Sequence, residues 1–140
     1  DGQETYVQSG WLRASHRKLD RKKSTVTNPF PTHFKKDAAR LPRGKFTKVR
    51  IPVFAAAHAF RKGSKLRITV SAVGGDRAIW HFATLDRGKT KNTILLGGKK
   101  PSKLVLPVLA GEDAQNTPLP APEALRGEPS RDYAKASNGG

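Results

Sequence analysis

The sequence has no cysteine, and only 11 of its 140 residues are acidic. Without cysteine, disulfide bonds and cysteine-ligated zinc are excluded, and the redox compartment stays open. No run of about 18 apolar residues occurs, so no membrane-spanning segment is predicted. The opening residues Asp1–Glu4 do not resemble a signal peptide. The localisation of the protein is therefore left unknown. The length of 140 residues is that of one ordinary domain.

The residue patterns of common catalytic sites are also missing. No serine has glycines at the offsets of a Gly-x-Ser-x-Gly nucleophile elbow, and no pair of carboxylates suits acid–base catalysis. The turn Gly74-Gly75-Asp76-Arg77 lacks the lysine and the following helix of a phosphate-binding loop. The sequence alone therefore predicts no catalytic residue, no cofactor and no metal site.

Four histidines, His16, His33, His58 and His81, are the remaining candidates for a chemical role. No two of them have the spacing of a His-Glu-x-x-His zinc motif, and acidic ligands are scarce. Structural histidines are often half-buried beside a backbone partner. A structural role is therefore the favoured interpretation for each of the four.

Positive charge is abundant and unevenly spread. The formal net charge is +16, and residues 1–110 hold 24 Lys or Arg against 6 Asp or Glu. Residues 111–140 hold 3 against 5, together with four prolines, and have no periodic apolar pattern. Such a composition cannot bury enough surface to offset the entropy of ordering. We therefore expect a folded part over residues 1–110 and a flexible, disordered tail over residues 111–140.

Hydrophobic residues in the folded part recur with a period of two. The alternation is clear over residues 48–53, 65–72 and 103–108, and it is typical of strands with one wet and one buried face. No window predicts a long amphipathic helix, and Arg61-Lys62-Gly63-Ser64 is predicted to turn the chain. A polar connection over residues 19–44, with three prolines, fits a Greek-key or jelly-roll topology better than a meander. The predicted fold class is all-β, as a sandwich or barrel.

The basic clusters raise the question of an anionic partner. They are Arg17-Lys18, Arg21-Lys22-Lys23, Lys35-Lys36, Arg61-Lys62 and Lys99-Lys100. Aromatic residues make up 7% of the sequence and are not interleaved with these clusters as a stacking platform requires. Solvated loop charge is therefore favoured over a role in nucleic-acid binding.

Three segments together resemble a known enzyme family. They are Gly10-Trp11-Leu12-Arg13-Ala14-Ser15-His16-Arg17, followed by Pro31-Thr32-His33; Phe60-Arg61-Lys62-Gly63-Ser64-Lys65-Leu66-Arg67; and Pro101-Ser102-Lys103-Leu104-Val105-Leu106-Pro107-Val108. In order and spacing, they are similar to the C-terminal domain of the Xaa-Pro dipeptidyl-peptidase and cocaine-esterase (CocE/NonD) hydrolases. The resemblance covers about residues 1–110.

The resemblance implies a fold and a division of labour. The family has an α/β-hydrolase domain with a Ser, Asp and His triad, followed by a jelly-roll, galactose-binding-like β-sandwich. The matching segments all fall on the jelly roll, so no triad residue is carried over. Asp1-Gly2 is similar to a hairpin turn inside that domain, which implies that the chain lacks the first strands. Residues 71–77 replace a family Ser-Ser-x-Phe-Pro-Arg-Phe stretch, so substrate preference is not carried over.

The resulting hypothesis is an accessory, non-catalytic β-domain of a serine hydrolase. Its implied partner is an upstream α/β-hydrolase domain of the same protein. The β-domain would pack on that partner and help to shape the active-site cleft or a dimer interface. Assembly into a homo-oligomer is left open. Trp11, Trp80 and Phe82 are the candidate interface residues, although plain core packing is the favoured role for Trp80 and Phe82. The alternatives are a carbohydrate-binding or a polyanion-binding module, because a jelly roll does not fix function. No membrane partner is expected, and nucleic acid is disfavoured.

The chain alone is expected to show no hydrolytic activity, because it has neither a nucleophile elbow nor an acid–base pair. The measurement is turnover of p-nitrophenyl esters and Xaa-Pro-anilides by the purified 140-residue chain. Turnover above background that disappears in His16→Ala or His33→Ala would show an unrecognised site.

Overall fold

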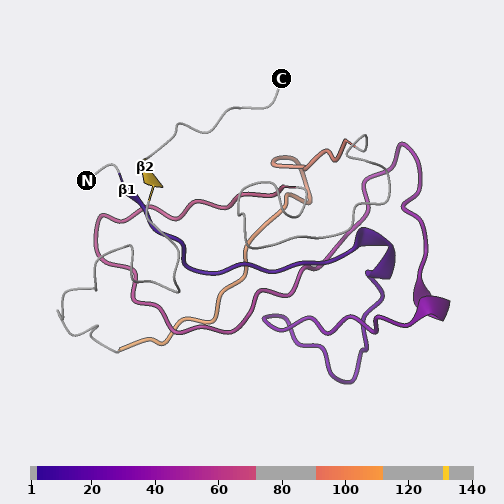
Figure 1. Ribbon diagram of the computed structural model, residues 1–140, viewed down its shortest axis with the longest axis horizontal. Coiled ribbons are helices and arrows are strands. Elements are labelled where there is room, and N and C mark those ends of the chain that lie inside the picture. The colour runs from indigo at the N-terminus through magenta and orange to yellow at the C-terminus, as the bar shows by residue number, and fades with distance from the viewer. Residues whose placement is uncertain (1–2, 72–90, 112–130, 133–140) are drawn as a thin grey trace.

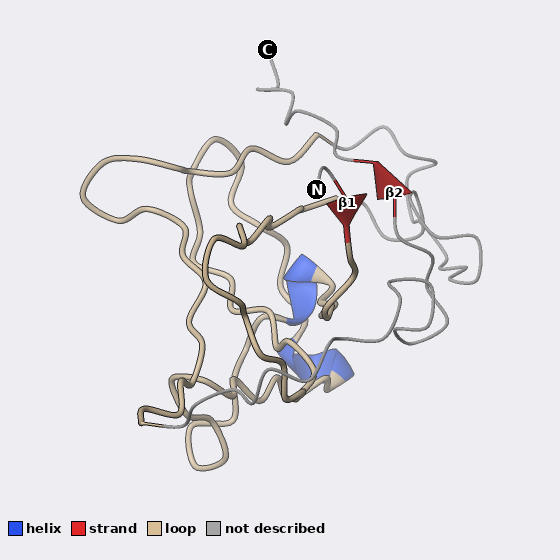
Figure 2. Cartoon of the chain, turned by 90° about the vertical axis from the view of Figure 1, so that its left-hand side faces the viewer, coloured by secondary structure: helices blue, strands red, loops and turns tan. Residues whose placement is uncertain are grey.

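The computed structural model describes residues 3–71, 91–111 and 131–132 (Figure 1). Four short elements occur in them, in the order β1 (Gln3–Glu4), η1 (Ala14–His16), η2 (Lys35–Asp37) and β2 (Arg131–Asp132). The η elements are single turns of 3-10 helix, and Figure 2 shows them close together. The remaining described residues form loops that cross the molecule in long extended paths (Figures 1 and 2).

Strands β1 and β2 form a two-stranded antiparallel sheet. Gln3 pairs with Asp132, and Glu4 pairs with Arg131. The sequence assigns β2 to the flexible tail 111–140, of which only residues 111, 131 and 132 are described. The two residues of β2 are paired rather than free. Extended backbone beside β1 can form this pairing because a strand edge presents N–H and C=O groups to a neighbouring strand.

Two extended segments far apart in the sequence cross close to each other around Gly10. The amide of Phe54 donates a hydrogen bond of 3.2 Å to the Ser9 carbonyl. An ideal Cβ at Gly10 would lie 2.8 Å from the Pro52 carbonyl carbon and 2.9 Å from the Val53 Cα, and would overlap the Pro52 carbonyl oxygen. Only glycine permits this approach of the two backbones.

The long connection after η1 folds back on itself as a closed loop. Leu19 and Pro31 form an antiparallel bridge, and it is flanked by hydrogen bonds from Asp20 N to Phe30 O and from Thr32 N to Lys18 O. The loop then enters η2. The Arg17 guanidinium donates to the carbonyls of Ala14 and Ala39, and so ties the residues after η2 to η1.

Two further contacts fix the remaining described segments. Arg67 Nε lies 2.8 Å from Glu4 Oε1, which joins residues around 67 to β1. The predicted turn at residues 61–64 is confirmed: Ser64 N donates to Arg61 O, and Gly63 has a φ of 85°. No helix among the described residues is long and apolar enough to cross a membrane.

Burial among the described residues is low. Only Pro29 and Pro31 are buried, and no hydrophobic core residue is found in this part of the chain. The segments 48–53 and 103–108, and the described residues of 65–72, are not strands here. Ile68 is 59% exposed and Val70 is 56% exposed, so the apolar face that the alternation predicts is not buried here. Alternating residues need a second layer to cover them, and the jelly-roll sandwich stays a prediction.

Replacement of Gly10 by alanine should destabilise the chain by about 1–3 kcal/mol, because the added Cβ meets rigid backbone rather than a movable side chain. The measurement is the free energy of unfolding in urea, followed by tryptophan fluorescence, since Trp11 adjoins the crossing.

Gly97→Ala is the matched control. Its Cβ would meet nothing within 4 Å, and Gly97 has no left-handed φ. This change should alter the free energy of unfolding by no more than about 0.5 kcal/mol. Equal effects of the two substitutions would contradict the close crossing.

Candidate functional site

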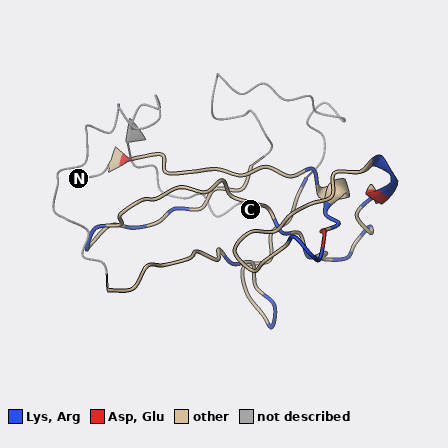
Figure 3. Ribbon diagram, turned by 90° about the horizontal axis from the view of Figure 1, so that it is seen from below, with Lys and Arg blue, Asp and Glu red and all other residues tan. Residues whose placement is uncertain are grey.

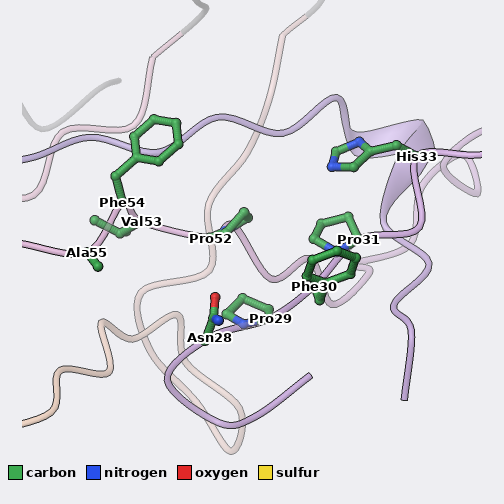
Figure 4. A pocket seen from close by; sticks show the side chains of 9 residues that line it. All are labelled: Asn28, Pro29, Phe30, Pro31, His33, Pro52, Val53, Phe54 and Ala55. Carbon is green, nitrogen blue, oxygen red and sulfur yellow. The ribbon is translucent and has the colours of Figure 1, made fainter. Parts of the chain in front are cut away.

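A mainly apolar pocket of about 330 Å³ lies between two segments of the chain. One wall comes from residues 28–33 and the other from residues 52–55 (Figure 4). Prolines and phenylalanines dominate, and the full lining consists of Asn28, Pro29, Phe30, Pro31, His33, Pro52, Val53, Phe54 and Ala55. The pocket therefore brings together residues that are 19 to 27 positions apart in the sequence.

The first wall is held by hydrogen bonds within the closed loop. Phe30 N donates to Ser24 Oγ at 2.9 Å, and Asn28 N donates to Thr25 Oγ1 at 2.9 Å. Hydroxyl groups thus satisfy backbone donors that have no helix or sheet partner. Pro29 and Pro31, which are the two buried residues in the described part of the chain, lie in this wall and have no N–H to satisfy.

The second wall is supported by a ring contact with Trp11. Its ring meets the Phe54 ring edge to face, with centroids 5.2 Å apart and planes at 70°. Such aromatic pairs contribute about 0.5–1.5 kcal/mol beyond simple burial. The Gly10 crossing places this pair, because the segment 9–11 runs directly against residues 52–54.

His33 occupies the end of the pocket in an unusual backbone conformation. Its φ is 56°, in the left-handed region, and it is the one non-glycine residue with positive φ among the described residues. Figure 4 shows its ring turned toward the side formed by Pro52 and Phe54. Neighbouring hydrogen bonds, from Thr32 N to Lys18 O and from Asp37 N to Phe34 O, hold the chain on both sides of it.

Positive charge surrounds the loop that forms the first wall. Residues 17–37 contain seven Lys or Arg and two Asp, and Figure 3 shows basic residues along this loop and near both η elements. One oxygen of Asp20 accepts hydrogen bonds from the amides of Lys22 and Lys23. The Asp20 carboxylate thus caps the turn, while the exposed Lys22 and Lys23 side chains remain at the surface.

Two lysines of this region lie over aromatic rings. Lys23 Nζ is 5.0 Å from the centroid of Phe30, which lines the pocket. Lys36 Nζ is 5.5 Å from the centroid of Phe34. Both rings are more than 40% exposed. Sequence reasoning missed these pairs and the pocket itself; the only signal was the run of prolines and phenylalanines at residues 29–34.

The candidates from the sequence have mixed outcomes. Trp11 lies against a lining residue of the pocket, whereas Trp80, Phe82 and His81 lie outside the described residues. His16 Nδ1 is 3.1 Å from Ser15 Oγ, and the His58 ring packs edge to face on Phe60. In the part of the chain that the structure describes, no three His, Asp or Glu side chains form a group that could hold a metal ion.

In a comparison with protein families, residues 1–105 match the C-terminal non-catalytic domain of X-Pro dipeptidyl-peptidases. The chain belongs to this family. The resemblance seen in the sequence motifs is thereby confirmed. Neither the curated proteins nor the solved structures gave a match.

Membership of the X-Pro dipeptidyl-peptidase C-terminal domain family gives the motif residues a physical context. Gly10 and Trp11 of the first motif form the crossing and the pocket support, and Arg17 ties the two η elements. In the Pro31-Thr32-His33 motif, the proline and the histidine line the pocket. Thr32 Oγ1 donates a hydrogen bond of 2.7 Å to Asp37 Oδ2.

Asp37 braces the loop in this family member. Its other oxygen lies 2.6 Å from Lys18 Nζ, and its side chain is only 8% exposed although that of Lys18 is 62% exposed. The hydrogen bond from Lys18, and then that from Thr32, lower the pKa of Asp37 below its ordinary value of 3.8. The ionised carboxylate therefore links Lys18, before the loop, to Thr32 after it.

The stability that this brace provides should depend on pH. A lowered pKa means that the contribution is fully present above the unfolded pKa of 3.8 and is lost as pH falls through the still lower folded pKa. Asp37→Asn should therefore unfold at lower urea concentration than the unchanged protein near neutral pH. The difference should shrink as the pH falls below about 4.

Lys18→Gln is the partner control, because it removes the first cause of the shift. It should move the NMR titration midpoint of the Asp37 carboxyl upward, toward the ordinary value. A midpoint that stays unchanged in Lys18→Gln would contradict the assigned cause.

Proposed function

We propose that this chain packs against the α/β-hydrolase catalytic domain of an X-Pro dipeptidyl-peptidase or related esterase, and helps to shape the active-site cleft or a dimer interface. The family to which the chain belongs is described as non-catalytic, so the proposed contribution is one of contact and support. We propose, further, that the domain completes a jelly-roll sandwich in that setting.

One observation carries the proposal: large apolar side chains are exposed throughout the described residues. Phe34 is 59% exposed, Phe46 is 65% exposed and Phe54 is 56% exposed. Isolated exposed apolar residues are ordinary, but many of them together with no buried core are typical of a surface that another domain covers. The pocket described above adds a concave apolar feature of the kind found at domain interfaces.

A second candidate function, binding to a polyanion, is favoured by the positive charge and by the position of two lysines. The sequence carries 27 Lys or Arg against 11 Asp or Glu, and Lys23 and Lys36 lie over exposed aromatic rings. Carbohydrate binding has weaker support: Trp80, an aromatic side chain that could contact a sugar, lies outside the described residues.

The test compares the whole peptidase that carries this chain with the same protein truncated before residue 1. In the whole protein, lysine-reactive cross-linking and mass spectrometry should find links between this chain and the catalytic domain. Truncation should lower kcat/KM for an Xaa-Pro-anilide or lower the thermal midpoint of the catalytic domain, because apolar surface becomes exposed to water.

Absence of cross-links between the domains, with unchanged kinetics and stability after truncation, would refute the packing role. A parallel titration with heparin separates the second candidate. Binding that persists at moderate salt would favour a shaped polyanion site over general charge attraction.

A further inference from the structure

The pocket and its basic loop form one preorganised surface, and its two parts differ in chemistry. We infer that this surface is the docking site for an apolar side chain carried on an acidic segment of the catalytic domain. The inference rests on the proposed packing function and goes further, since it names the face of this chain that makes the contact and the chemistry of the segment that it receives.

The interior of the pocket selects an apolar side chain. Three prolines and two phenylalanines line it, and its volume is about 330 Å³. Ligand pockets generally range from about 300 to 1,000 Å³, so this one is at the small end and suits a single large side chain. Interfaces commonly concentrate their energy in such anchors, buried in a pocket and surrounded by a polar rim.

The basic loop beside the pocket, residues 17–37, favours a partner with negative charge. Residues 17–37 hold seven Lys or Arg, and both Asp residues in that range are already engaged inside the chain. Asp20 accepts from backbone amides, and Asp37 accepts from Lys18 and Thr32. Within residues 17–37 the seven cationic side chains thus outnumber the two carboxylates, and this excess of positive charge favours carboxylates on the partner.

Lys23 connects the two parts of the surface. Its ammonium group lies 5.0 Å from the centroid of the Phe30 ring, which lines the pocket. A carboxylate that pairs with Lys23 would therefore lie next to a side chain that enters the pocket. This spacing favours an acidic residue near the anchor in the sequence of the partner segment.

The surface is also ordered before any partner binds. The left-handed conformation of His33 is held by hydrogen bonds on both sides, and hydroxyl groups fix the backbone at Asn28 and Phe30. Sparsely populated backbone conformations persist where the surroundings determine them, and they are frequent at ligand clamps. Order of this kind lowers the entropy lost on association.

The absence of cysteine from the chain permits a direct test in the whole peptidase. Asn28→Cys places a thiol in the lining of the pocket, and no hydrogen bond of the Asn28 side chain is lost in the described contacts. Val26→Cys, on the same loop, is the matched control, since Val26 is 72% exposed and does not line the pocket. The rate of maleimide labelling at each position is read by peptide mass spectrometry.

Labelling at position 28 should be at least about tenfold slower than at position 26, as expected for a covered site with an opening free energy of the usual size. Lys23→Glu in the Asn28→Cys background should then raise the labelling rate about two- to fivefold, since it places a negative charge beside the carboxylate of the partner segment and so weakens docking. Lys100→Glu, which does not affect the pocket lining, should leave the rate unchanged.

Other outcomes overturn the inference in distinguishable ways. Equal labelling at positions 26 and 28, while cross-links between the domains are present, refutes this docking site and leaves the packing function standing. Absence of the cross-links together with equal labelling refutes both. Protection that grows with protein concentration assigns the pocket to a second copy of the chain, and protection that appears only with heparin or an oligonucleotide assigns it to a polyanion.

Discussion

The close crossing of two backbones at Gly10 is the constraint on which the candidate site depends. It brings residues 52–54 against residues 9–11 and sets the Phe54 ring on Trp11. One wall of the pocket therefore has a fixed position relative to η1. The opposite wall follows η1 in the chain, so both walls are connected to the segment that contains the crossing. The lack of a Cβ at Gly10 thus permits the contact between distant segments that positions one wall of the pocket.

Carboxylates have an internal use in this strongly basic chain. Asp20 caps a turn, Asp37 braces the loop against η2, and Glu4 pairs with Arg67 beside β1. Each of these carboxylates bonds to a backbone amide or to a basic side chain, and so holds two parts of the backbone near each other. The lysines and arginines thereby dominate the surface field, and the same few acids explain both the order of the loop and its outward positive charge.

Sequence reasoning succeeded where the signal is local or carried by ordered motifs. The turn at Gly63 and the family followed from short patterns. The pocket did not, because its walls are separated in sequence and meet only through the Gly10 crossing. The alternation around Ile68 predicts one buried face, yet the residue is exposed; periodicity records which face a strand would bury, and not whether a covering layer is present.

Three of the lining residues of the pocket, Pro29, Pro31 and Pro52, have no backbone N–H. At these positions the walls offer carbonyl acceptors and ring carbons, but no main-chain donor. A carboxylate placed against these three prolines would lose part of its hydration shell and gain no main-chain hydrogen bond from them, which is unfavourable. A bound partner segment is therefore oriented: its hydrocarbon side chain enters the pocket, while its carboxylates stay outside beside the lysines.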